Sequence, residues 1–118
     1  MNKKIIFVLL IFISCSKTYE KSSDHTGNYT GRIITYTTYN SDTFQTEIEV
    51  SPGNNSNELK MIIPPFSTIA TLTGNSFNLE PSLGEFAGGN GIFAGDTMHI
   101  SYNTFSGYTT LYLGILVR

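Results

Sequence analysis

Hydrophobic and polar residues alternate along most of the chain after residue 26. The segment Thr43–Val50 shows the pattern most clearly. One face of this segment carries Phe44, Thr46, Ile48 and Val50, and the other carries Gln45, Glu47 and Glu49. A period of two is typical of a β-strand with one side in water. The two glutamates are therefore expected to lie on a solvated face, and not to act as a catalytic carboxylate pair.

Further short segments are rich in β-branched and aromatic residues, which favour strands. The predicted strands are Asn28–Asn40, Thr43–Val50, Glu58–Ile63, Thr68–Thr73, Ser76–Glu80, Glu85–Ala94, Thr97–Asn103 and Tyr108–Val117. Pro64-Pro65 ends one of them, and Gly74-Asn75 is a two-residue loop suited to a hairpin. No segment has convincing helical periodicity. The sequence predicts an all-β fold, an antiparallel meander of about eight short strands that forms a small barrel or a two-layer sandwich.

Two of these segments depart from simple alternation. Tyr108–Val117 is apolar on both faces, so we expect it to lie between other strands or against the barrel mouth instead of forming an exposed edge. Glu85–Ala94 is rich in glycine, which permits a bulge or a close backbone approach.

The first fifteen residues have a different pattern. Lys3 and Lys4 precede the apolar run Ile5–Ile13, which is followed by Ser14 and Cys15. A basic segment followed by a short apolar segment is typical of a secretory signal peptide. The run is about half the ~20 residues that a membrane-spanning helix needs.

The sequence Phe12-Ile13-Ser14-Cys15 resembles the lipobox of bacterial lipoproteins. This resemblance implies that Cys15 receives a diacylglyceryl group and becomes the first residue of the mature protein. We therefore expect a lipoprotein signal peptide over 1–14, a lipidated cysteine and flexible tether over 15–26, and a β domain over 27–118. Since Ser16 and not Asp follows the cysteine, the resemblance implies a lipid anchor in the outer membrane of a Gram-negative envelope.

Charge and cysteine content narrow the function classes. Residues 15–118 contain five basic and nine acidic residues, and Cys15 is the only cysteine in the chain. With no basic patch, nucleic acid is not an expected partner. With no second thiol, the fold cannot depend on an internal disulfide.

No motif for a metalloprotease, a hydrolase nucleophile or a phosphate-binding loop is present, so we expect no catalytic residue, metal site or cofactor. His25 lies in the expected tether and is predicted to be solvated, and His99 is predicted to point to solvent or to a polar seam. Six tyrosines could form a stacking platform or could simply be strand residues. They are Tyr29, Tyr36, Tyr39, Tyr102, Tyr108 and Tyr112.

The domain resembles the small lipocalin-like, or calycin-like, lipoproteins of Gram-negative envelopes. The likeness rests on Gly27-Asn28-Tyr29, on Gly74-Asn75 with Phe77 after it, and on Gly88–Asp96 running into Ile100-Ser101-Tyr102. It implies that Arg118 stacks on Tyr29, which stands where lipocalins have tryptophan. Because the chain is shorter than a typical lipocalin, we expect its own side chains to fill the interior.

These observations predict a non-enzymatic, membrane-anchored envelope lipoprotein. It would bind an unknown partner protein or a small hydrophobic ligand, or serve structurally. The alternative from another class is a small envelope hydrolase or lyase with an unrecognised site. An integral outer-membrane barrel is disfavoured by predicted strands shorter than the ~9–11 residues that cross a membrane and by charged residues on faces that would meet lipid.

Overall fold

The computed structural model describes residues 22–118 except residue 83. A 3₁₀ helix, η1, precedes eight strands in this part of the chain. Their bounds are η1 Ser22–His25, β1 Gly27–Tyr36, β2 Ser41–Pro52, β3 Glu58–Ile63, β4 Phe66–Thr73, β5 Ser76–Leu79, β6 Phe86–Ala94, β7 Thr97–Phe105 and β8 Thr109–Val117. The predicted signal peptide and Cys15 lie outside the described residues.

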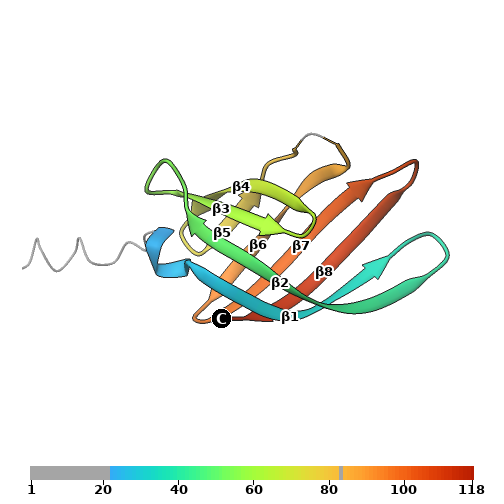
Figure 1. The fold of residues 1–118 in the computed structure, drawn as a ribbon, viewed down its shortest axis with the longest axis horizontal. Helices are drawn as coiled ribbons and strands as arrows, with labels where there is room; N and C mark the ends of the chain where they lie inside the picture. The colour runs from blue at the N-terminus through green and yellow to red at the C-terminus, as the bar shows by residue number, and fades with distance from the viewer. Residues whose placement is uncertain (1–21, 83) are drawn as a thin grey trace, which may run out of the picture.

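The strands form a closed antiparallel barrel in chain order, as Figure 1 shows. Each strand pairs with the next, and β8 closes the barrel against β1, with Arg32 opposite Ile115. The all-β prediction is confirmed, and the barrel is the correct one of its two forms. The first predicted strand extended too far, because β1 ends at Tyr36. β4 begins at Phe66 and β7 continues to Phe105, so both are longer than predicted.

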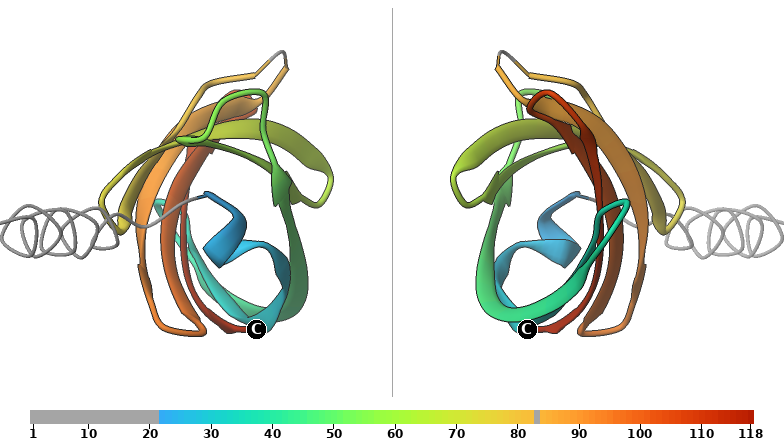
Figure 2. Two further views of the ribbon diagram at one scale, coloured as in Figure 1. Left: turned by 90° about the vertical axis from the view of Figure 1, so that its left-hand side faces the viewer. Right: turned by 90° about the vertical axis from the view of Figure 1, so that its right-hand side faces the viewer.

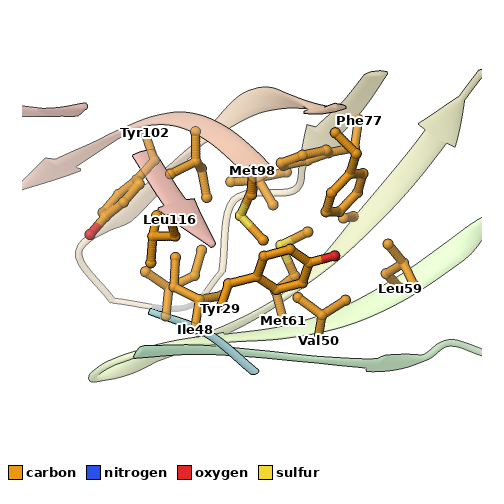
Figure 3. Close-up of a cluster of buried hydrophobic side chains, with 14 of the residues drawn as sticks. Tyr29, Ile48, Val50, Leu59, Met61, Phe77, Met98, Tyr102 and Leu116 are labelled. Carbon is orange, nitrogen blue, oxygen red and sulfur yellow. The ribbon is translucent and has the colours of Figure 1, made fainter. Parts of the chain in front are cut away.

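The inward sides of the strands are mostly apolar, with buried Thr68, Thr104 and Thr110 as exceptions, and large side chains pack in the interior (Figure 3). Along β3, alternation places Leu59, Met61 and Ile63 inside and leaves Lys60 in solvent. The largest side chains with almost no exposed surface are Tyr29, Ile33, Ile48, Leu59, Met61, Ile63, Phe77, Phe86, Phe93, Met98 and Leu116. Burial of each contributes ~1.5–3 kcal/mol. The core alone therefore supplies the stability that disulfides supply in many small exported domains.

Glycines allow neighbouring strands to approach closely on the inner side of the wall. A Cβ atom at Gly31 would lie 2.2 Å from the backbone oxygen of Ile115 on β8. At Gly91 it would lie 2.2 Å from the ring of Phe77 and 2.4 Å from the backbone oxygen of His99. A register shift between Phe86 and Gly88 adds a bulge to the same strand. The close approach and the bulge predicted for the glycine-rich segment are confirmed.

One end of the barrel is closed by η1, which lies within the outline of the barrel in both views of Figure 2. His25 is 4% exposed and stacks on Phe93, with 4.2 Å between ring centroids. The Tyr29 hydroxyl donates a hydrogen bond of 2.8 Å to the His25 backbone oxygen. The prediction that His25 is a solvated tether residue is therefore wrong. The sequence around His25 is polar, so the burial of His25 depends on partners that no local pattern reveals.

The opposite end of the barrel is less covered. Here Phe44 of β2 is 39% exposed, although Ile48 and Val50, farther along the same inner face, are buried. The alternation predicted for this strand is thus confirmed, but burial decreases toward the mouth. The strand is longer than the layer of side chains that fills the barrel, so its first inward residues reach solvent.

Candidate functional site

A hollow lies on the outer wall of the barrel, across β2, β1, β8, β7 and β6. Its volume is about 1000 Å³. Its lining combines outward side chains with the backbone of inward-facing residues. The lining residues are Gly31, Arg32, Ile34, Thr43, Gln45, Asn90, Gly91, Ile92, His99, Ile100, Ser101, Leu113, Gly114 and Ile115. We call this hollow the outer groove.

Strand pairing aligns the outward side chains of the outer groove in two rows. The first row is Gln45, Arg32, Ile115, His99 and Ile92, and the second is Thr43, Ile34, Leu113, Ser101 and Asn90. Each row crosses five adjacent strands. Neighbouring strands are ~4.8 Å apart, so each row is about 19 Å long. Successive outward residues of one strand are ~7 Å apart, so the two rows run parallel at about that distance. The outer groove therefore runs across the strands and not along them.

Apolar side chains dominate the middle of the outer groove. Ile34 is 37% exposed, Leu113 40% and Ile115 59%. Ile92 near one end is 46% exposed. Single exposed apolar residues are normal, but a contiguous set marks an interaction surface.

Arg32 is the cation of the outer groove. It lies between Gln45 and Ile115 in its row, and the described lining contains no Asp or Glu. Across residues 22–118, residue 83 aside, the ion pair found joins Arg118 to Asp96 and does not involve Arg32. His99 is exposed in the same row, which confirms that it faces outward. The nearest outward carboxylate by register is Glu47, diagonal to Arg32 on β2, and no ion pair between them is found among the described residues. Beside an apolar surface, such an arginine favours an anionic group on whatever binds there.

A file of aromatic rings crosses the packed interior of the barrel near its open mouth. Successive ring pairs join Phe44, Tyr112, Tyr102, Phe86 and Phe66. The two tyrosines are stacked, with 4.6 Å between centroids, and Tyr39 and Tyr108 lie far out in solvent. Burial raises the pKa of the Tyr102 hydroxyl well above its usual value, and the nearby Tyr112 adds to the effect. Tyr29 and Tyr102 are thus core residues, whereas Tyr36 is exposed as well, so the six tyrosines do not form one platform.

The closed end of the barrel is fastened by Arg118. Its guanidinium donates hydrogen bonds to Asp96 Oδ1 at 2.6 and 3.1 Å, and to the backbone oxygens of Asp24 and Thr26 at 2.7 and 3.1 Å. Its Cζ lies 5.6 Å from the centre of the Tyr29 ring, so the predicted stacking is confirmed. The hydrogen bond to Asp96 raises the pKa of Arg118. Burial raises the pKa of Tyr29, and the positive charge of Arg118 offsets part of that rise. This cluster holds η1 on the barrel.

Among the described residues, no group of three or more His, Cys, Asp and Glu side chains is arranged to hold a metal ion. None of the described helices is both long and apolar enough to cross a membrane. Cys15, the predicted lipid attachment site, lies outside the described residues.

The chain was also compared with known proteins. No protein-family model matches it, and no curated protein matches it. The arguments for function therefore rest on the residues of this chain alone.

Sequence reasoning located His99 on an outer face but did not find the outer groove. The signal that could have revealed it is the apolar outward side of β8, namely Leu111, Leu113, Ile115 and Val117. The sequence predicts only that this strand lies between other strands or against the barrel mouth. β8 does lie between β7 and β1 as predicted, but pairing covers only its edges. Its outer side stays open.

Proposed function

We propose that this protein is a non-enzymatic lipoprotein of the cell envelope that binds an apolar partner on the outer wall of its barrel. The observation that carries the proposal is the outer groove, an exposed apolar hollow on a barrel whose interior is filled. Binding sites are concave, mostly apolar and furnished with a few polar groups. In the outer groove Arg32, Gln45 and Ser101 would be those polar groups.

The anchor in this proposal is an acylated Cys15 at the outer membrane of a Gram-negative envelope. Support comes from the basic and apolar segments before Ser14 and from the lipobox-like residues Phe12–Cys15. Stable attachment needs about two acyl chains, which a diacylglyceryl cysteine provides. The barrel would then be held near the membrane with its wall available to other envelope components.

A lipocalin-like ancestry belongs to the same proposal. It is supported by the barrel of eight strands in chain order and by Arg118 over the ring of Tyr29, the arrangement that the resemblance implied. The proposed binding surface differs from a lipocalin cavity, since the interior here is packed with residues such as Phe77 and Met98. The barrel would serve as a scaffold and not as a container.

Metabolic labelling with alkynyl palmitate tests the anchor. Label should enter the wild-type chain and be lost in Cys15→Ala. A Ser14→Ala variant is the matched control, because alanine is accepted at that lipobox position and should retain the label. An unlabelled wild-type chain, or label that persists in Cys15→Ala, would contradict the anchor.

A photo-crosslinking amino acid placed at single positions in intact envelopes tests the binding surface. A crosslinker at Ile115 should give a discrete adduct, whereas one at Lys60, an outward residue of β3 away from the outer groove, should not. Equal adducts at both positions, or none at Ile115, would refute binding at the outer groove.

A further inference from the structure

We infer that residues 41–48 of β2 accept an extended segment of a partner protein as an added antiparallel strand, and that this segment carries lysine or arginine opposite Glu47. The contacts would be made by backbone groups at the rim of the barrel and not by the outer groove. The inference therefore goes beyond the proposed function and does not depend on it. It follows from strand register, backbone direction, the rings at the mouth and the charge of β2.

The barrel is closed along only part of β2. Residues 41–50 all pair with β1, but pairing with β3 begins at Glu49, which lies opposite Ile62. The β3–β4 hairpin turns back after Ile63, whereas the β1–β2 hairpin extends well beyond it (Figure 1). Residues 41–48 thus have a neighbouring strand on one side only. We call them the open edge.

Alternate residues of the open edge direct their backbone groups away from β1. The hydrogen bond from the Thr37 N–H to the Asn40 backbone oxygen fixes this alternation. The residues whose N–H and C=O groups point to the open side are Ser41, Thr43, Gln45 and Glu47. The N–H of Thr43 donates to Asp42 Oδ1 at 2.8 Å, and within residues 22–118, residue 83 aside, no backbone partner is found for the rest. Such a row is a template for another strand.

The open edge also lacks the usual protection against strand addition. Isolated edges commonly carry proline, lysine or a bulge, each of which hinders pairing. The open edge contains neither proline nor lysine, and its register with β1 has no shift. An antiparallel strand added here would continue the line of β3 in a sheet whose strand pairs are all antiparallel.

The rings at the mouth favour apolar side chains on the inner side of the added strand. Phe44, in the middle of the open edge, faces inward and is 39% exposed. Its ring centroid lies 6.5 Å from that of Tyr112, which is partly buried, as is Phe66 at the start of β4. Side chains directly opposite one another on paired strands have Cβ atoms ~5 Å apart. An apolar residue opposite Phe44 would therefore cover these rings.

Charge decides between a second copy of this chain and a different partner. The open edge carries Asp42 and Glu47, and β2 has no lysine or arginine. The β1 residues opposite these two are the uncharged Thr35 and Thr30. Two copies paired through β2 would bring carboxylates of both copies together without a cation from either β2. A segment with a basic residue opposite Glu47 would form a favourable cross-strand charge pair instead.

Peptides with blocked backbone groups test strand addition. The full-length protein in phosphatidylcholine nanodiscs is titrated, by fluorescence anisotropy, with a labelled eight-residue peptide in which valine alternates with lysine and threonine. In the predicted pairing the valines face inward, and the lysine and threonine residues bond to β2. N-methyl groups on the lysine and threonine residues should weaken binding about tenfold or more. N-methyl groups on the valines are the matched control and should leave affinity within about twofold.

Protein variants test the same bonds from the other side. Gln45→Pro removes an N–H that points to the open side, so pairing with β1 is kept. Gln45→Ala removes the same side chain but keeps the N–H. The proline variant should bind the peptide about tenfold more weakly than the alanine variant. Circular dichroism checks that both variants are folded.

A charge exchange tests the partner's chemistry. A peptide with glutamate in place of lysine should bind the wild type about fivefold more weakly than the lysine peptide. Glu47→Lys should reverse this preference. Equal affinity of the two peptides for the wild type would overturn the basic character of the segment.

The remaining outcomes are also decisive. No binding of the lysine peptide, equal weakening by the two sets of N-methyl groups, or equal affinity of Gln45→Pro and Gln45→Ala would overturn strand addition. Sedimentation equilibrium that shows a dimer lost in Gln45→Pro but kept in Gln45→Ala would overturn the inference in favour of a second copy. If the crosslinker at Ile115 gives no adduct while the peptides behave as predicted, the proposed function fails and this inference stands.

Discussion

The inner and outer sides of β8 have similar apolar side chains but opposite surroundings. Leu116 points inward and is fully buried, whereas its neighbour Ile115 points outward and is 59% exposed. The inner residue stabilises the barrel by removing apolar surface from water. The outer residue contributes little to folding, so its apolar character needs another explanation. Binding provides that explanation, because a contiguous exposed apolar surface on a small domain marks an interaction site.

The largest loss of stability is expected for a substitution that adds a side chain on the tightly packed inner side of the barrel wall. Gly31→Val places side-chain atoms against the backbone of Ile115 and Leu116, which cannot move without breaking the pairing of β1 and β8. We expect a loss of about 4 kcal/mol or more in the free energy of unfolding. Urea denaturation followed by circular dichroism measures it.

The matched control for that variant is Gly95→Ala. Gly95 has a φ of 61° and open space around its Cβ position, so only backbone strain of ~1–2 kcal/mol should appear. Equal losses in the two variants would show that space inside the wall is not limiting at Gly31.

A pair of truncations compares the two sides of β8 residue by residue. Leu116→Ala should cost ~3 kcal/mol, because it opens a cavity in a filled core. Ile115→Ala should lie within ~0.5 kcal/mol of the wild type, since its side chain is largely in water. Urea midpoints for both variants give the values. A destabilisation by Ile115→Ala as large as that by Leu116→Ala would mean that the outer side is structural.

Alkaline pH tests the buried tyrosines. The folded state raises the pKa of Tyr29 and Tyr102. It therefore holds their protons more tightly than the unfolded chain does, where tyrosine titrates near pH ~10. Their contribution to stability is complete below that pH and is lost as the pH rises above it, at up to ~1.4 kcal/mol per pH unit and group. Urea midpoints between about pH 9 and 11.5 should fall.

Tyr102→Phe is the control for the fall of the urea midpoint with rising pH. It removes one of the two titrating hydroxyls, so the midpoint should fall less steeply with pH, while Tyr29 leaves part of the slope in place. A wild-type midpoint that is constant over the same range would contradict the burial of these hydroxyls.

The smallest expected effect concerns the closed end of the barrel. Arg118→Lys keeps the positive charge but cannot hold Asp96 and the η1 carbonyls in one planar fork. We expect a loss of ~1 kcal/mol and faster amide exchange at the backbone around residues 24–29. Hydrogen-exchange mass spectrometry measures the exchange. Unchanged protection at that end would show that Arg118 does not fasten η1.

Much of the fold could be predicted because strand alternation is a local signal. The inward Leu59, Met61 and Ile63 follow from a period of two, and the hairpin at Gly74-Asn75 follows from turn chemistry. His25 could not be predicted, since its burial comes from a stack on Phe93, far along the chain. Closure into a barrel instead of a sandwich depends on the pairing of β1 with β8, which no local pattern specifies.

The site was harder to predict than the fold. The apolar outward residues Leu113 and Ile115 were visible in the sequence, but they indicated only a strand between other strands or against the barrel mouth. Arg32 and Ile92 belong to the same row only through three successive strand registers. A surface assembled from five strands has no continuous sequence signature, so it appears only when the registers are known.

The central claim is that this barrel binds on its outer wall and not in its interior. Amide chemical-shift mapping of the full-length protein in phosphatidylcholine nanodiscs tests it most directly, with the apolar anionic dye anilinonaphthalene sulfonate as the probe. We predict shifts concentrated at residues 90–92, 99–101 and 113–115. Shifts confined to the mouth around Phe44, Phe66 and Tyr112 would contradict the claim.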